Sequence, residues 1–433
     1  MQNSELYTGW RMVAAGAQML FVAFGALVLM PLITGLDPSV ALFTAGIGTL
    51  IFQLVTKRSI PVFLGSSFVF IAPIMFSVET WGMAATMGAL FCAGLVYVAM
   101  AGMIAVRGSG WLHRLLPPVV TGPIIMIIGL GLAPIAVNMA MGKTGDGAVE
   151  LFPYADAMMV SMPALLTTLL VATTAKGLFR LIPILSGVAV GYLIAAISGM
   201  VDYSAVTNSA WISVPSFVAP EFNLSAILFM LPVAIAPAIE HVGDVLAIGS
   251  VTGKDYVKKP GLHRTLLGDG LATSASSLFG GPPNTTYSEV TGAVLLTKAF
   301  NPKIMIWAAV FAISLAFVAK FGALLQTIPA PVMGGILILL FGSIAGVGMN
   351  ILIKGQVDLN NQRNLVIVAV TLVFGIGGMA VGNDSWHLQG VSLCGIVAII
   401  LNLVLPQTSP DEALADDLQE EKQIVEDIVD HGR

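Results

Sequence analysis

Three carboxylates lie inside apolar stretches of this sequence. Glu240 and Asp244 occur in "LPVAIAPAIEHVGDVLAIG", and Glu289 occurs in "GGPPNTTYSEVTG". A charged side chain at the centre of a membrane helix costs about 2.5 to 3.5 kcal/mol on insertion scales, so such residues usually face a cavity and serve a function. Glu240 and Asp244 are four positions apart and share one helix face, where repulsion between two carboxylates favours a proton on one of them. These acids are candidates for binding a ligand and for carrying a proton.

The residues around these acids favour a flat, polar ligand. No lysine or arginine lies deep in the apolar stretches, which speaks against an anion, while a metal cation is conceivable. Phe68 and Tyr287 lie at interrupted stretches, where their rings could stack on a ligand. Carboxylates accept hydrogen bonds from ligand N–H groups, and free backbone N–H groups donate to ligand carbonyls. A pyrimidinedione offers both kinds of group, so we expect a small planar ligand, with or without a coupled proton.

Two further polar residues lie close to these acids in the sequence. His241 follows Glu240 and points about 100° away around a helix, which favours packing or hydrogen bonding over proton transfer. Asp269, in "LLGDGLAT", either caps a helix or supports the site. Cys92 and Cys394 lie in apolar segments without the spacing of a metal or redox pair, so we assign no metal ligands.

The elements that position these residues must be membrane segments. The chain has 433 residues, of which 57% are hydrophobic and only 10% are charged, whereas soluble proteins have roughly 25% charged residues. Apolar runs of about 20 residues recur along it, and each can cross a hydrocarbon core of about 30 Å as a helix. We expect fourteen segments, at 12–35, 39–56, 60–76, 81–106, 116–141, 157–175, 181–201, 224–249, 265–279, 281–297, 304–325, 331–353, 364–381 and 388–405.

The distribution of charge predicts the orientation. With fourteen segments and the N-terminus in the cytoplasm, 17 of the 19 basic residues lie on the cytoplasmic side, as the positive-inside rule requires. The C-terminus is then cytoplasmic as well. The last stretch, 406–433, holds nine acids against two bases, and we expect an acidic tail that is either solvated and mobile or forms a short surface helix.

The two halves of the sequence are similar to each other. "PVVTGPIIMIIGLGLA", which begins at Pro118, and "PVMGGILILLFGSIA", which begins at Pro331, align at an offset of 213. Pro118 opens the fifth segment and Pro331 the twelfth, so each half has seven segments and the second half enters the membrane inverted. The same offset carries 65–73 onto 278–286, two stretches interrupted by glycine or proline. Paired broken segments in inverted halves indicate a substrate site near the membrane midplane.

Several motifs resemble one transporter family. "GSSFVFIAP", "AIEHVGDVLAIG", "KKPGLHRTLLGDG", "GGPPNTTYSEVTGAVLLTK" and "PAPVMGGI" are similar to the nucleobase/ascorbate transporter family, in its uracil permease branch. The resemblance implies an all-α fold of fourteen segments in two inverted repeats, with short antiparallel strands in segments 3 and 10. It further implies a homodimer, and a division into a core domain (1–115 and 223–325), a gate domain (116–222 and 326–405) and the tail 406–433.

The resemblance also implies roles for individual residues. Glu240 and Glu289 match the two carboxylates that bind the base. Phe68, Tyr287 and Ser288 match the positions whose rings or backbone hold it.

Two positions vary within the family or depart from its pattern. Asp244 matches the proton-linked position, which is histidine in some uracil permeases and aspartate in many purine transporters, so either Asp244 or Glu240 carries the proton. Phe341 stands where some uracil permeases have a tyrosine of the gate, which removes a hydroxyl contact.

Together these features predict proton-coupled uptake of uracil across a bacterial inner membrane. The alternative substrates are xanthine and uric acid. The alternative mechanism is passive facilitation without a coupled proton. The alternative protein class is an anion transporter of a related inverted-repeat fold. We find no signature of an enzyme, expect no nucleic-acid partner, and expect no cofactor other than the proton as coupling ion.

Overall fold

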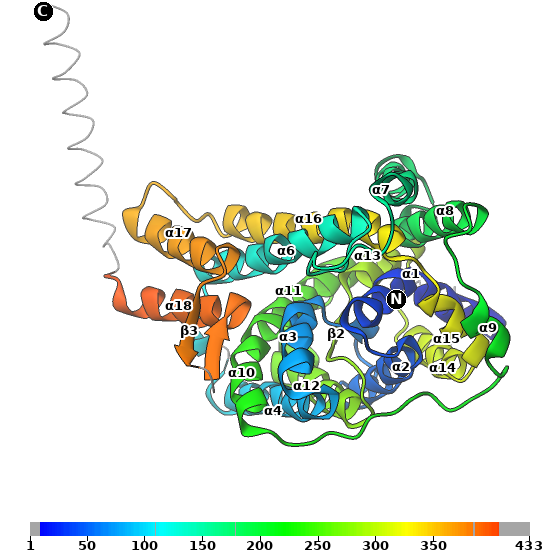
Figure 1. Ribbon diagram of the computed structural model, residues 1–433. Helices are drawn as coiled ribbons and strands as arrows, with labels where there is room; N and C mark the ends of the chain where they lie inside the picture. Colours follow the sequence, from blue (N-terminus) through cyan, green and yellow to red (C-terminus); the bar gives the residue numbers. More distant parts are fainter. Residues whose placement is uncertain (1–8, 109, 178, 384–385, 407–433) are drawn as a thin grey trace, which may run out of the picture.

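The computed structural model describes residues 9–406 except 109, 178 and 384–385. Within that part, the side chains at 112, 113, 239, 288, 289, 383, 386–389 and 392 lie outside the description. Helices dominate, and they follow one another along the chain with only short strands between them (Figure 1).

The first half of the chain contains α1(Trp10–Thr34), α2(Pro38–Val55), β1(Leu64–Ser66), the 3-10 helix η1(Phe68–Phe70), α3(Ile71–Trp81), α4(Met83–Arg107), α5(Gly110–Leu115), α6(Pro118–Ala140), α7(Tyr154–Thr174), η2(Phe179–Leu181), α8(Pro183–Ile197) and α9(Ser204–Asn208). The second half contains α10(Leu224–Met230), η3(Pro232–Ala234), α11(Ile235–Thr252), η4(Val257–Gly261), α12(Leu262–Leu278), β2(Asn284–Thr286), α13(Ser288–Thr297), α14(Lys303–Ala316), α15(Ala319–Gln326), α16(Ala330–Lys354), α17(Gln362–Ile376), β3(Ala380–Asn383), β4(Trp386–Gln389) and α18(Gly390–Val404).

Local sequence signals explain several helix boundaries. Asp37 precedes α2, and its Oδ1 accepts a 2.8 Å hydrogen bond from the N–H of Ser39. Pro38 and Pro118 begin α2 and α6. Proline suits the first position of a helix, because the N–H group that it lacks would have no acceptor within the helix. Helix α1 ends before Gly35, whose φ of 73° lies in the left-handed region that glycine adopts without strain.

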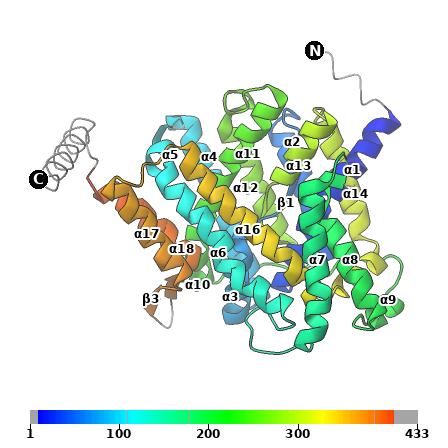
Figure 2. The ribbon, with the colours of Figure 1, turned by 90° about the horizontal axis from the view of Figure 1, so that it is seen from above.

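The helices pack in two groups. In one, α6 and α16 lie side by side, and α7, α8, α17 and α18 pack against them (Figures 1 and 2). In the other, α2 and α12 contact each other, and α1, α4 and α14 pack around them. Glycine allows the close approach of α6 and α16, since a Cβ on Gly129 would lie 2.3 Å from the carbonyl oxygen of Phe341.

A two-stranded sheet joins the two broken segments. Strand β1 pairs antiparallel with β2, with Leu64 opposite Thr286 and Ser66 opposite Asn284. Each strand is followed at once by a helical turn, η1 after β1 and α13 after β2. This confirms the short antiparallel strands expected in segments 3 and 10.

The constant offset between the halves is wrong at these strands. Leu64 and Asn284 begin the two equivalent strands, so the offset here is 220 rather than 213. The connections within the two halves differ in length, so an offset measured between α6 and α16 does not carry over to β1 and β2.

Each of the fourteen expected ranges contains a helix of the structure. By length and composition, seven helical runs in the described residues can cross a membrane, and α14 with α15 adds an eighth that is bent by 83°. The expected single helix at 224–249 is interrupted, because α10 and α11 are separated by a 3-10 turn at Pro232. The structure also contains an unexpected hairpin, β3 with β4, where only a connection was expected.

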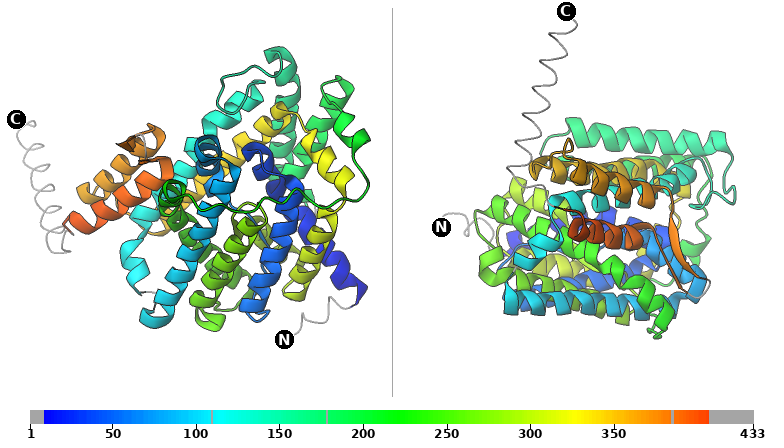
Figure 3. Two further views of the ribbon diagram at one scale, coloured as in Figure 1. Left: turned by 60° about the horizontal axis from the view of Figure 1, so that its bottom comes forward. Right: turned by 90° about the vertical axis from the view of Figure 1, so that its left-hand side faces the viewer.

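A long extended connection between α9 and α10 crosses one end of the second helix group (Figure 3). Backbone N–H groups of Ser213, Val218 and Glu221 donate to carbonyl oxygens of Phe317, Phe279 and Ala84 at 3.1, 3.3 and 2.8 Å. These bonds attach the connection to the ends of α14, α12 and α4, so it packs with that group.

Candidate functional site

The two broken segments border a cavity of about 470 Å³ between the two helix groups. Its wall on one side comes from β1, η1, β2 and α11, and its wall on the other side comes from α6 and α16. The lining residues are Ser66, Phe68, Val69, Ile125, Ile128, Glu240, Gly243, Asp244, Ala247, Thr285, Thr286, Tyr287, Leu340, Ser343, Ile344, Val347, Asn350, Ile351 and Lys354.

The two acids of α11 face this cavity together. Glu240 is half-buried and Asp244 is 8% exposed, and both lie in the wall. Gly243 lies between them in the wall and adds no side chain. The prediction that Glu240 and Asp244 share one helix face is confirmed.

Asp244 is bound to the strand pair. The hydroxyl of Thr286 donates a 2.6 Å hydrogen bond to Oδ2 of Asp244, and both groups are buried. A hydrogen bond to a charged group contributes about 1.5 to 3 kcal/mol, more than one between neutral groups. The state of Asp244 is therefore linked directly to the position of β2.

Hydroxyl groups of the strands supply further polar contacts. Ser66 and Thr285 line the cavity, and their buried side-chain oxygens have no hydrogen-bond partner among the described residues. A buried hydroxyl without a partner carries a desolvation penalty of about 1 to 3 kcal/mol, which a ligand in the cavity would relieve. The sequence analysis missed both residues, although both lie inside the interrupted stretches that it singled out.

The two aromatic residues expected at the site both line the cavity. Phe68 is half-buried at the start of η1. Tyr287 is 4% exposed, and its hydroxyl donates a 3.0 Å hydrogen bond to the carbonyl oxygen of Ser66. Its ring covers Gly65, where a Cβ would lie 2.4 Å from the ring carbon Cζ. Tyr287 thus fixes the strand pair as well as forming part of the wall.

Ser288 and Glu289 begin α13 directly after Tyr287, so the backbone places them beside the cavity. Their side chains lie outside the described part of the structure. Their expected role in substrate binding therefore stays a prediction.

His241 and Asp269 lie behind the site and not in its wall. Nδ1 of His241 is 3.3 Å from Oδ2 of Asp269, and both side chains are fully buried. His241 also packs against the ring of Phe52, with 6.3 Å between ring centroids. Asp269 lies in the interior of α12, so the alternative of a helix-capping role is wrong, and the pair fixes α11 against α12.

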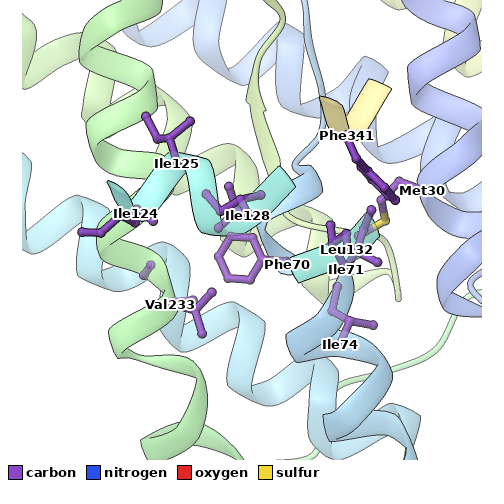
Figure 4. Packing of buried hydrophobic residues seen from close by; sticks show 14 of the residues in the cluster. Met30, Phe70, Ile71, Ile74, Ile124, Ile125, Ile128, Leu132, Val233 and Phe341 are labelled. Atoms are coloured by element: carbon purple, nitrogen blue, oxygen red, sulfur yellow. The ribbon is translucent and has the colours of Figure 1, made fainter. Parts of the chain in front are cut away.

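The structure places Phe341 behind the cavity wall, so the supporting role expected for it stays a prediction. Phe341 is 1% exposed and lies outside the cavity wall, on the part of α16 that faces Met30 (Figure 4). Its neighbours Leu340, Ser343 and Ile344 line the cavity instead. A helix turns by about 100° per residue, so a one-residue step moves a side chain from the cavity into the core.

One end of the cavity is open. Along α16 the lining residues recur on one face from Leu340 to Lys354, and the side chains of Ser343, Asn350 and Lys354 in this row are exposed. On α11, Ala247 is exposed in the same direction. The mouth of the cavity therefore lies at the C-terminal ends of α11 and α16, and it carries a cation, Lys354.

The other end of the cavity is closed by apolar side chains. Val69 and Ile128 are each 4% exposed, and they line both this cavity and a second, apolar one of about 200 Å³. Beside them, Phe70 packs in the cluster of buried side chains between α3 and α6 that Figure 4 shows. One layer of side chains thus separates the two cavities.

A family profile and several curated proteins match this chain. The profile Xan_ur_permease, described as a permease family, matches residues 11–383. A probable uracil permease of Pasteurella multocida is 60% identical over 392 residues, which cover 90% of this chain and 93% of that protein. The uracil permeases of Bacillus subtilis and Escherichia coli are 42% and 37% identical, covering 94% and 92% of this chain and 96% and 93% of those proteins.

Solved structures share the fold at low sequence identity. The transmembrane domain of the cyanobacterial bicarbonate transporter BicA has a TM-score of 0.63 at 16% identity, and the match covers 90% of this chain and 96% of that one. The murine anion transporter Slc26a9 in its inward-facing state has a TM-score of 0.67 at 10% identity, covering 93% of this chain and 68% of that one. At such identities the likeness concerns the fold alone.

Proposed function

This chain belongs to the permease family, and on that premise we propose that it takes up uracil together with protons. It is a multi-pass membrane protein and a transporter rather than an enzyme. Uracil is the substrate named for the three curated relatives, each of which matches this chain over most of both lengths.

The observation that carries the choice of substrate is the polar wall of the cavity. Uracil has two ring N–H donors and two carbonyl acceptors. Glu240 can accept from a ring N–H, while the unpartnered hydroxyls of Ser66 and Thr285 can donate to a carbonyl or accept in turn. Phe68 offers a ring face for stacking, and Glu289 at the start of α13 supplies the second carboxylate.

Asp244 is proposed to couple the proton to transport. It lies one helical turn from Glu240 in the same wall and is bonded to Thr286 of the strand pair. Gain or loss of a proton at Asp244 therefore changes a bond that positions β2. In this scheme protonated Asp244 allows the site to form, and loss of the proton to the cytoplasm weakens the site and releases uracil.

We further propose fourteen crossings in two inverted halves, with the α6–α16 group as the gate domain and the other group as the core domain. Both termini are then in the cytoplasm of a bacterial inner-membrane protein. Lys354 lies on that same side, so the open mouth of the cavity corresponds to an inward-facing state. A homodimer is expected from the resemblance.

Two alternative substrate classes, a purine base and an anion, can be distinguished from uracil in one competition assay. Xanthine or uric acid would need room for a second ring and would compete with uracil for the same wall. An anion would need a cation in that wall, whereas the lining places its one cation, Lys354, at the mouth. Uptake of labelled uracil into proteoliposomes, with xanthine, uric acid and bicarbonate as competitors, separates these substrates.

The test of the site uses Glu240→Gln with Glu79→Gln as control. Glu240 faces the cavity, whereas Glu79 is exposed near the end of α3. We expect Glu240→Gln to weaken uracil binding about tenfold or more, because a charged acceptor is replaced by a neutral amide oxygen, which makes a weaker hydrogen bond. Glu79→Gln should bind normally. Equal binding by both variants would exclude Glu240 from the site.

The test of coupling uses Asp244→Asn, which resembles the protonated acid permanently. This variant should bind uracil and exchange it across the membrane. It should fail to accumulate uracil when an inward proton gradient is imposed on the proteoliposomes. Normal accumulation by Asp244→Asn would transfer the coupling role to Glu240.

A further inference from the structure

A second polar cavity, of about 830 Å³, lies apart from the substrate cavity. It is formed by the end of α5, the start of α6, the end of α16, the start of α17 and the end of α18. Its lining residues are Arg114, Pro117, Pro118, Val119, Gly355, Gln356, Val357, Arg363, Asn364, Asn402, Leu403, Val404, Leu405 and Pro406. This lining contains two arginines and no acid.

The cavity is built around Arg363. Its guanidinium donates from Nη2 to the carbonyl oxygen and to Oδ1 of Asn402, at 2.7 and 2.9 Å, and from Nε to the carbonyl oxygen of Leu405 at 3.3 Å. Nδ2 of Asn402 in turn donates to the carbonyl oxygen of Arg114 at 3.1 Å. These bonds hold the side chain of Arg363, the backbone of Arg114 and the last turn of α18 in one arrangement.

Among the described residues, no acid lines this cavity to neutralise its positive charge. Asp358 follows Val357 in the chain, but it is exposed and its Oδ1 accepts from the backbone N–H of Asn360 within its own loop. The neutral polar side chains of Gln356 and Asn364 complete the lining. The cavity therefore suits an anionic group with several oxygen atoms.

The chain leaves α18 inside this cavity. Pro406, the last described residue, is one of its lining residues. The sequence that follows contains six acids and no base at 411–421, in "DEALADDLQEE". A segment tethered so close to its binding surface has an effective concentration on the order of millimolar, which makes even a weak ion-pair contact populated.

We propose that the acidic stretch 411–421 docks in this basic cavity of its own chain, with Arg114 as the principal free cation. An anionic lipid headgroup would meet the same guanidinium groups, but it lacks the tether. The docked segment would contact α5, the connection between α4 and α6, and the end of α16 next to Lys354.

Limited trypsin digestion of the full-length protein tests this proposal. Lys422 is the first basic residue after Arg363, so cleavage there reports access to the docked stretch. The rate of cleavage at Lys422 in the protein is divided by the rate of cleavage at the same residue in a synthetic peptide spanning 407–433. Both are measured under the same conditions, so the ratio is free of the direct effect of salt on trypsin. Docking predicts slower cleavage in the protein than in the peptide at low salt, and a smaller difference at high salt.

The key variant is Arg114→Gln, with Arg107→Gln at the exposed end of α4 as control. At low salt Arg114→Gln should be cleaved about two- to fivefold faster than the wild type, as expected for the loss of one partly exposed ion pair, and Arg107→Gln should not. If Arg114→Gln misfolds, the triple variant Asp411→Asn, Glu412→Gln, Asp416→Asn gives the same test while leaving residues 9–406 unchanged. Cleavage rates equal to those of the peptide would overturn the proposal. So would protection that appears only with added phosphatidylglycerol and persists in the triple variant, which would assign the cavity to lipid.

Discussion

Thr286 and Asp244 join the strand pair to α11 through a buried hydrogen bond of 2.6 Å. The bond links a strand that is fixed mainly by backbone pairing to the helix that carries both wall carboxylates. Because Asp244 is the proposed proton carrier, this contact is where protonation changes the geometry of the site.

Thr286→Val removes the hydroxyl and keeps the shape of the side chain. At a pH where Asp244 is ionised, we expect a loss of about 1.5 to 3 kcal/mol of stability, because a buried carboxylate loses its donor. The melting temperature of the purified protein should fall accordingly. In an Asp244→Asn background the same change should have a smaller effect, because the charged acceptor is already absent. Equal effects in both backgrounds would mean that Thr286 acts through packing alone.

Gly65→Ala should disrupt the site by displacing Tyr287. The new Cβ would lie 2.4 Å from Cζ of the Tyr287 ring, which is held in place by its bond to Ser66. Relief of this clash requires the Tyr287 ring to move and its bond to Ser66 to break, so we expect strongly reduced uracil binding. Gly102→Ala on α4 is the control, because its Cβ meets nothing within 4 Å. Retained binding in Gly65→Ala would show that the ring turns away without consequence.

Gly129→Ala should separate α6 from α16. Its Cβ would lie 2.3 Å from the carbonyl oxygen of Phe341 and 2.6 Å from the backbone nitrogen of Ala345. Overpacking of this kind costs about 1 to 3 kcal/mol, and here the opposing atoms are backbone. The melting temperature should fall, whereas Gly131→Ala, two residues along the same helix with nothing within 4 Å, should leave it unchanged or raise it. Similar melting curves for both variants would argue against the close packing described above.

Asp269→Asn should weaken the fold more than ligand binding. The change replaces the partner of a fully buried histidine, His241, at a cost of about 1 to 3 kcal/mol. Thermal unfolding followed by tryptophan fluorescence measures this loss. Asp255→Asn, at an exposed surface pair with Lys258, provides the control and should leave the melting temperature nearly unchanged, because exposed ion pairs contribute little to stability. If uracil affinity falls while the melting temperature stays constant, Asp269 contacts the ligand pathway rather than supporting α11.

Much of the site could be predicted from the sequence because membrane insertion penalises every polar group. Glu240 and Asp244 were visible as acids in apolar surroundings, and glycine and proline marked the strands at 64–66 and 284–286. Both signals follow from chemistry that depends on residue type alone.

The remaining features depend on rotation and register, which residue type does not determine. Phe341 and Leu340 differ by one position, yet only Leu340 reaches the cavity. Ser66 and Thr285 were inside the quoted motifs, but hydroxyls are common at packing interfaces, and only the cavity distinguishes these two. The alignment offset between the two halves was wrong at the strands for a similar reason. Connections of unequal length change the offset between equivalent residues, and composition does not reveal where this happens.

The layer formed by Val69 and Ile128 has a consequence for how the membrane stays insulated. Both side chains are β-branched and keep to few χ1 rotamers, so they do not open a path by rotating. Water and protons would therefore cross between the two cavities only when whole helices move. A continuous file of water between the two cavities would conduct protons, and the layer formed by these two stiff, methyl-bearing side chains interrupts such a file.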